Sequence, residues 1–159
     1  MGQQQLLLIV LGVIIVGIAI AVGISMFKSN AQSSNRDQVI NDLNNLAAKA
    51  QQYFRKPVAM AGGGQSFANF GVPPKNPTNP PVQGLSSTDT VDANGHYAVL
   101  AAAGVPTFPY TTYGTATANA TKDSCVIVGV GTEIGNNGKD PVQAYVTVTN
   151  NTIYTTVQN

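Results

Sequence analysis

The residues of this chain that could do catalytic or metal-binding chemistry are few, and they are scattered along the sequence. His96 is the only histidine and Cys125 is the only cysteine. A metal site needs several His, Cys, Asp or Glu ligands at close spacing, and neither residue has such neighbours. A lone cysteine also excludes an intramolecular disulfide. We therefore expect a solvent-facing structural role for His96. For Cys125 we expect a buried place on a strand, with a reactive or intermolecular thiol as the alternative.

Two further stretches resemble ligand-binding loops only in part. SSTDTVDANGH contains Asp89 and Asp92 but lacks the ladder of acids and the closing Glu of a calcium-binding EF-hand. The GGG at 62–64 is not followed by the Lys or the helix start that a phosphate-binding loop requires. Turn formation explains both stretches better. The sequence thus predicts no catalytic residue, no metal and no cofactor, and we do not expect an enzyme.

Surface modification and aromatic stacking are the remaining chemical possibilities. Asn119 and Asn150 each begin an N-x-T tripeptide and are candidate glycosylation sites, although such tripeptides arise readily by chance in a chain rich in Asn and Thr. The tyrosines are interpreted as core and interface packing rather than as a ligand-stacking array. The formal net charge is only +1, so we expect no nucleic-acid partner. A near-zero charge also favours self-association.

The N-terminal element is an apolar run, LLLIVLGVIIVGIAIAVGISMF, that covers residues 6–27 after a polar start at 1–5. As a helix it is roughly 33 Å long, which is enough to cross a hydrocarbon core of about 30 Å. A cleaved secretory signal is not expected, because the run is too long and MGQQQ carries no basic residue. The sequence predicts a membrane-spanning helix.

The next segment, residues 28–56, is predicted to be an amphipathic helix. Its apolar residues recur at spacings of three and four, which places them on one stripe; they are Val39, Leu43, Leu46, Ala50 and Tyr53, flanked by Phe54. Pro57 and the glycines at 62–64 end the helix. No Pro or Gly separates it from the apolar run, so one continuous helix from about Leu6 to about Arg55 is expected, with Ser33, Ser34 and Asn35 as an alternative local cap.

The C-terminal part, residues 57–159, is predicted to be a β-rich head that contains a Gly/Pro-rich loop at 61–84. SFANFGV is a candidate strand, and HYAVLAAA is a strand or a short helical piece. SCVIVGVGTEI, VQAYVTVT and TIYTTVQ follow with strand patterns and turn signals between them. We expect three or four antiparallel strands that cover one face with the amphipathic helix, an α+β fold.

This order of elements resembles the type IV pilins and pseudopilins. The resemblance rests on the apolar run, the contiguous amphipathic segment RDQVINDLNNLAAKAQQYFRKP and the β-rich end, and no single short motif carries it. Family members usually have a basic leader and a Glu at the fifth mature position, and this chain shows neither. If Met1 is the mature end, Gln5 takes that position and its amide carbonyl could accept from a neighbour's amine. If processing follows Gly2, that interaction is lost.

The resemblance implies a structural subunit of an extracellular filament. The subunit would first lie in the cytoplasmic membrane and would then pack its apolar helix among copies of itself. An assembly platform, an ATPase and, if the chain is processed, a leader peptidase would be its partners. The helix-packing residues then include small side chains that allow close approach: Leu6, Leu7, Leu11, Gly12, Val16, Gly17, Ile20, Ala21 and Gly23. The alternatives are a minor pseudopilin of a secretion system and a single-pass anchored binding or adhesion module.

Overall fold

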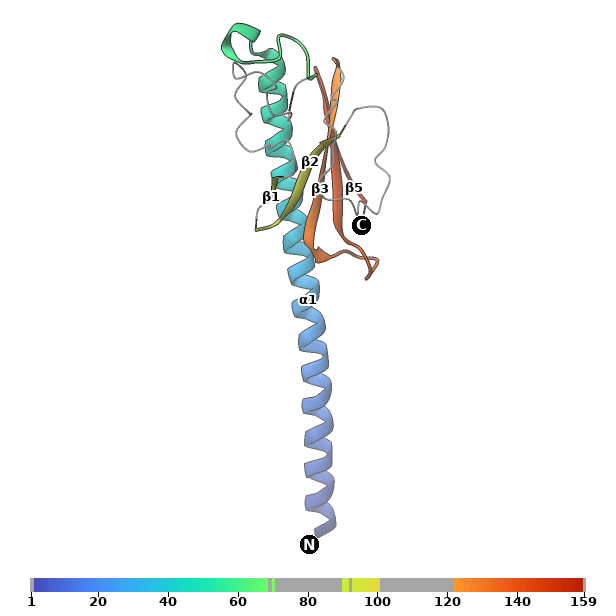
Figure 1. The fold of residues 1–159 in the computed structure, drawn as a ribbon. Helices are drawn as coiled ribbons and strands as arrows, with labels where there is room; N and C mark the ends of the chain where they lie inside the picture. Colours follow the sequence, from blue (N-terminus) through green and yellow to red (C-terminus); the bar gives the residue numbers. More distant parts are fainter. Residues whose placement is uncertain (1, 69, 71–89, 92, 101–121, 159) are drawn as a thin grey trace.

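The chain folds as one long helix that carries a small antiparallel sheet on its C-terminal half (Figure 1). The computed structural model describes residues 2–68, 70, 90–91, 93–100 and 122–158. The helix stands clear of the sheet over its N-terminal half (Figure 1). The α+β fold expected from the sequence, a long helix with an apolar first half and an amphipathic second half packed on a small antiparallel sheet, is therefore confirmed.

The helix α1 runs without a break over Gly2–Arg55. No proline lies within it, and it ends two residues before Pro57, whose ring and missing N–H are incompatible with a further turn. The short 3-10 helix η1 follows at Val58–Met60 and closes on Ala61, which adopts a left-handed conformation with φ of 59°. Ser33, Ser34 and Asn35 lie inside α1 and cap nothing.

The described strands form a meander in which each pairs with the next along the chain. They are β1 at Thr90–Val91, β2 at Gly95–Leu100, β3 at Ser124–Ile134, β4 at Pro141–Thr149 and β5 at Ile153–Val157. All pairs are antiparallel. The register shifts between Val130 and Ile134, at the end of β3. The turn predicted at Asn150–Asn151 joins β4 to β5.

Two details of the sheet differ from the sequence-based expectation. Over the described residues the sheet has five strands, one more than the expected three or four. The additional strand is β1, whose two residues are too few to show an alternating pattern in the sequence. The candidate strand SFANFGV is wrong over its described residues, which form a turn in which the Phe70 amide donates to the Phe67 carbonyl at 2.9 Å. Phe67 and Phe70 are fully buried, so their apolar character comes from core packing rather than from a strand.

The core lies between α1 and one face of the sheet. From α1 it receives Val39, Leu43, Leu46, Ala47, Ala50 and Tyr53. The sheet contributes side chains that alternate along β3 and β4, namely Cys125, Ile127, Ala144, Val146 and Val148. Since alternate residues of a strand point to one face, this pattern fixes which face of the sheet the helix covers.

Candidate assembly interface

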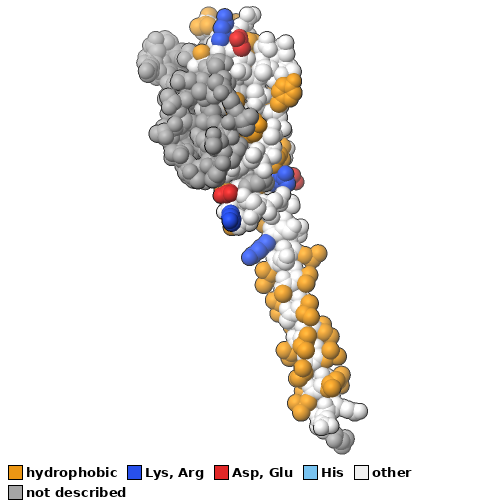
Figure 2. Space-filling model, turned by 90° about the vertical axis from the view of Figure 1, so that its right-hand side faces the viewer, with side chains coloured by type: hydrophobic (Ala, Val, Ile, Leu, Met, Phe, Trp, Pro, Cys, Tyr) orange, Lys and Arg blue, Asp and Glu red, His pale blue; other side chains and the backbone are white. Residues whose placement is uncertain are grey.

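The N-terminal half of α1 exposes a continuous apolar surface. Every large hydrophobic side chain from Leu6 to Phe27 is between 49% and 76% exposed in the single chain. Figure 2 shows these side chains around the narrow part of the molecule, below the head. By length and composition α1 can cross a membrane, and none of its most apolar window is buried within the chain. An exposed apolar surface of this size marks a contact with lipid or protein.

The predicted helix-packing residues all lie on this exposed rod, defined here as residues 6–27 of α1. Gly12 and Gly17 have nothing within 4 Å of the position that a Cβ atom would take, and the same holds for Gly23. These glycines are therefore not required by any contact inside the chain. Because these glycines have no side chain, the backbone of a neighbouring helix can approach closely there, as small residues allow in an apolar medium. Gln5 is exposed on the same helix, close to its N-terminal end.

The predicted helix–sheet residues lie where α1 meets the head. Val39, Leu43 and Ala50 are fully buried, and Leu46 and Tyr53 are less than a tenth exposed. Phe54 is half-buried and stacks on Phe67, with ring centroids 4.7 Å apart. Tyr53 lies beside Phe70 at 5.6 Å. Burial raises the pKa of the Tyr53 hydroxyl above its ordinary value.

A set of polar contacts fixes the lower end of the head on α1. The Asn35 amide nitrogen donates to the Asn94 carbonyl at 2.8 Å and to the Thr132 hydroxyl at 3.2 Å. The Glu133 backbone amide donates back to the Asn35 side-chain oxygen at 3.4 Å. One helical turn below, Gln32 donates to the Asn136 side chain at 3.2 Å. Asn35 thus joins the turn that precedes β2 to the C-terminal end of β3, two segments that lie side by side in the sheet.

Asp42 extends these contacts along the helix. The Tyr97 hydroxyl donates to the Asp42 carboxylate at 2.9 Å, and the Asn94 side chain donates to the same oxygen at 3.3 Å. Higher up, the Thr155 hydroxyl donates to the Asn44 side chain at 2.8 Å. We call the contacts of Asn35 and Asp42 the polar clamp. Sequence reasoning missed it, because polar residues on an amphipathic helix ordinarily face water and no local pattern identifies partners more than 50 residues away.

The candidate catalytic, metal-binding and glycosylation residues lie on the sheet and its turns, or outside the described residues. Cys125 is fully buried on β3, where burial raises the pKa of its thiol to about 12. His96 lies on β2, but its side chain is outside the described part, as are Asp89, Asp92 and Asn119. Asn150 is exposed in the β4–β5 turn. Among the described residues no group of three or more His, Cys, Asp or Glu is placed to hold a metal ion.

Comparison of the chain with protein-family models, with curated proteins and with solved structures gives no match. The candidate interface is an exposed apolar rod joined to a head whose core cluster contains no side chain of the rod.

Proposed function

We propose that the chain is the structural subunit of an extracellular pilin-like filament. The single observation that carries the proposal is the exposed rod: its apolar side chains are not buried by any of the residues that the structure describes, while the next part of the same helix is packed against the sheet. A membrane supplies the first partner, since the rod matches the thickness of a hydrocarbon core. Copies of the chain supply the second.

The transfer from lipid to filament needs a source of free energy outside the rod itself. Lipid tails are about as apolar as the side chains of the rod, so the hydrophobic effect does not favour one environment over the other. Close van der Waals packing between helices favours the filament, and the small residues support such packing. An assembly platform and an ATPase would supply the remainder, as the resemblance to pilins implies. A minor pseudopilin would use the same surfaces in a shorter filament.

The first experiment looks for the filament. Material sheared from the source cells is viewed by negative-stain electron microscopy, and its main component is identified by mass spectrometry. We expect thin fibres composed of this chain. A single-pass anchored binding module would instead give only monomers or dimers on extraction in detergent, and that result would overturn the proposal.

A second experiment tests whether the rod packs against copies of itself. Gly17→Leu keeps the rod apolar and removes a helix-weakening glycine, a gain of about 0.8–1 kcal/mol for the isolated helix. Because no described atom lies within 4 Å of the position that a Cβ would take at Gly17, loss of fibres would report on packing between copies. We expect fibre yield to fall while membrane-inserted subunit stays at its normal level. Ile18→Leu is the matched control and should assemble normally.

A further inference from the structure

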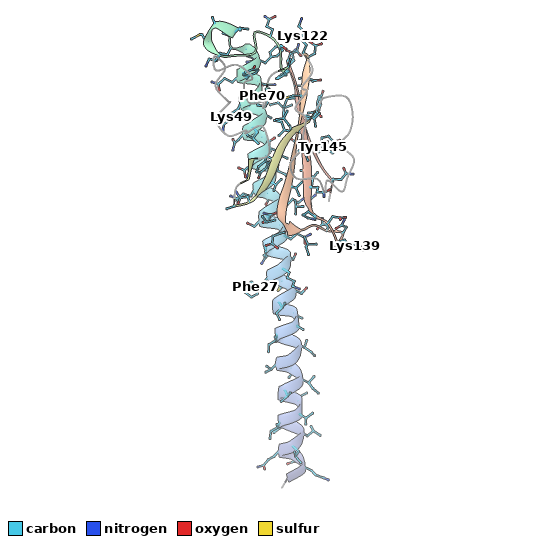
Figure 3. The ribbon with its side chains drawn as sticks, viewed as in Figure 1. Phe27, Lys49, Phe70, Lys122, Lys139 and Tyr145 are labelled. Atoms are coloured by element: carbon cyan, nitrogen blue, oxygen red, sulfur yellow. The ribbon has the colours of Figure 1, made fainter. Side chains whose placement is uncertain are left out.

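The two ends of the head carry exposed patches of opposite character. At the upper end, beside the C-terminus of α1, we define the tip patch as the exposed residues Arg55, Lys56, Val58, Met60 and Lys122. At the lower end, where β3 passes into β4, we define the base patch as the exposed Glu133 and Ile134 together with the half-buried Asp140, whose carboxylate accepts a hydrogen bond from the Asn137 side chain at 2.8 Å. Figure 3 shows Lys122 and Lys139 at these opposite ends.

Both patches combine apolar and charged side chains. In the tip patch Val58 is 66% exposed and Met60 is 64% exposed, and in the base patch Ile134 is 56% exposed. At the upper end Ile153, at the start of β5, is also 38% exposed. Val58 and Met60 lie two residues apart and form a small exposed apolar surface at the tip, and Ile134 offers a single apolar side chain at the base.

The charges of the two patches are complementary. The tip patch has three cationic side chains, with Asp123 as an acidic neighbour on the chain, whereas the base patch has two carboxylates, with Lys139 as a basic neighbour. The tip is therefore net positive and the base net negative. Opposite potentials on two surfaces favour their association and set its register.

The lengths of the head and the rod are matched. From Gln32, which contacts the lower turn at Asn136, to Lys56 at the tip, the helical rise is about 36 Å, against about 33 Å for the rod. A second copy raised by one head height brings its base onto the tip of the first. Its rod then begins close to where the rod of the first copy ends, so the same shift keeps an apolar filament core continuous.

From these observations we propose that the tip patch of one subunit docks on the base patch of a second copy of the chain. Val58 and Met60 cover Ile134, and the cations of the tip meet Glu133 and Asp140. The contact rests on the proposed filament and adds to it a second interface, between heads, that fixes the axial shift between copies.

A charge exchange tests the contact in fibres grown in the source cells. Lys56→Glu and Glu133→Lys each place like charges across the contact, and we expect the fraction of protein that pellets as fibre to fall about threefold or more in each variant. Combining the two substitutions restores opposite charges and should return the yield to the wild-type level. Lys56→Arg preserves the charge and is the matched control.

Crosslinking tests the geometry of the contact. Fibres that carry both Met60→Cys and Ile134→Cys are treated with a mild copper oxidant and run on a denaturing gel without reductant. We expect a ladder of covalent oligomers, because a disulfide requires Cα atoms within about 7 Å. The control pair combines Met60→Cys with Thr156→Cys on the exposed strand β5 and should give no ladder. Cys125 is buried and does not interfere.

The outcomes separate the two proposals. Normal fibres that show neither the charge effect nor the ladder would overturn the tip–base contact and leave the filament standing. If the wild-type chain forms no fibres, the filament itself is overturned.

Discussion

Removal of the rod should leave the head folded. A fragment that starts at Lys28 lacks every apolar side chain of the rod but keeps all the buried residues of α1, which begin at Val39. It also keeps Gln32 and the polar clamp. Four residues precede Gln32 in this fragment. The new helix end can therefore fray by about one turn before any contact between the helix and the head is lost.

The expected change in the free energy of unfolding is small. Changes at surface positions away from buried contacts ordinarily stay within about 0.5 kcal/mol, and the deleted residues form no part of the head core. The fragment should therefore be a soluble monomer in light scattering. Its urea midpoint by circular dichroism should match that of the head in the full chain in mild detergent.

Asn35→Ala in the same fragment is the matched comparison. It removes the hydrogen bonds from Asn35 to Asn94 and Thr132 and the one it accepts from Glu133. A partly exposed set of this kind contributes about 1–2 kcal/mol. An aggregated or unfolded starting fragment would refute the reasoning, because it would mean that the head depends on the rod. An Asn35→Ala fragment as stable as its parent would refute the clamp.

Two further predictions concern the core of the head. Leu43→Ala, which truncates a fully buried side chain, should cost about 2–5 kcal/mol in the same urea assay, and a cost below 1 kcal/mol would contradict the helix–sheet packing. Because the pKa of the Cys125 thiol is raised from 9.0 to about 12, the unfolded chain loses this proton first as the pH rises above 9. Stability should then fall between pH 9 and 12 by up to about 1.4 kcal/mol per unit from this group. Cys125→Ala should show a shallower slope, and equal slopes would contradict the prediction.

Strands of the head that carry a long alternation of apolar and polar residues could be predicted from the sequence. The alternation in VQAYVTVT placed Val142, Ala144, Val146 and Val148 on one face, and all four are fully buried. The helix was equally readable, because apolar spacing and the absence of Pro agree over its whole length. Such long patterns average over many residues, so one unusual residue does not change the result.

Short and long-range features escaped prediction for physical reasons. SFANFGV has the aromatic content of a strand, yet its two phenylalanines belong to a turn and pack against Tyr53 and Phe54 of the helix. The unbroken run in β3 buries Val126, Val128 and Val130 on the face opposite the helix, and an apolar run alone does not say what covers each face. Asn35 looked like a weak helix former, whereas its side chain binds the backbone of Asn94.

The two halves of α1 draw their stability from separate sources, as the proposed filament subunit requires. Helices in proteins draw most of their stability from tertiary packing. The upper half of α1 obtains such packing from the sheet, and the lower half obtains none from the described part of the chain. The boundary between the two halves lies at Gln32 and Asn35, which make the polar contacts with the head that lie nearest the rod. In the proposed filament the rod would therefore exchange lipid for neighbouring helices while the core between Val39 and Tyr53 stays unchanged. It follows that hydrogen exchange in this core should be the same in the detergent-solubilised subunit and in the fibre.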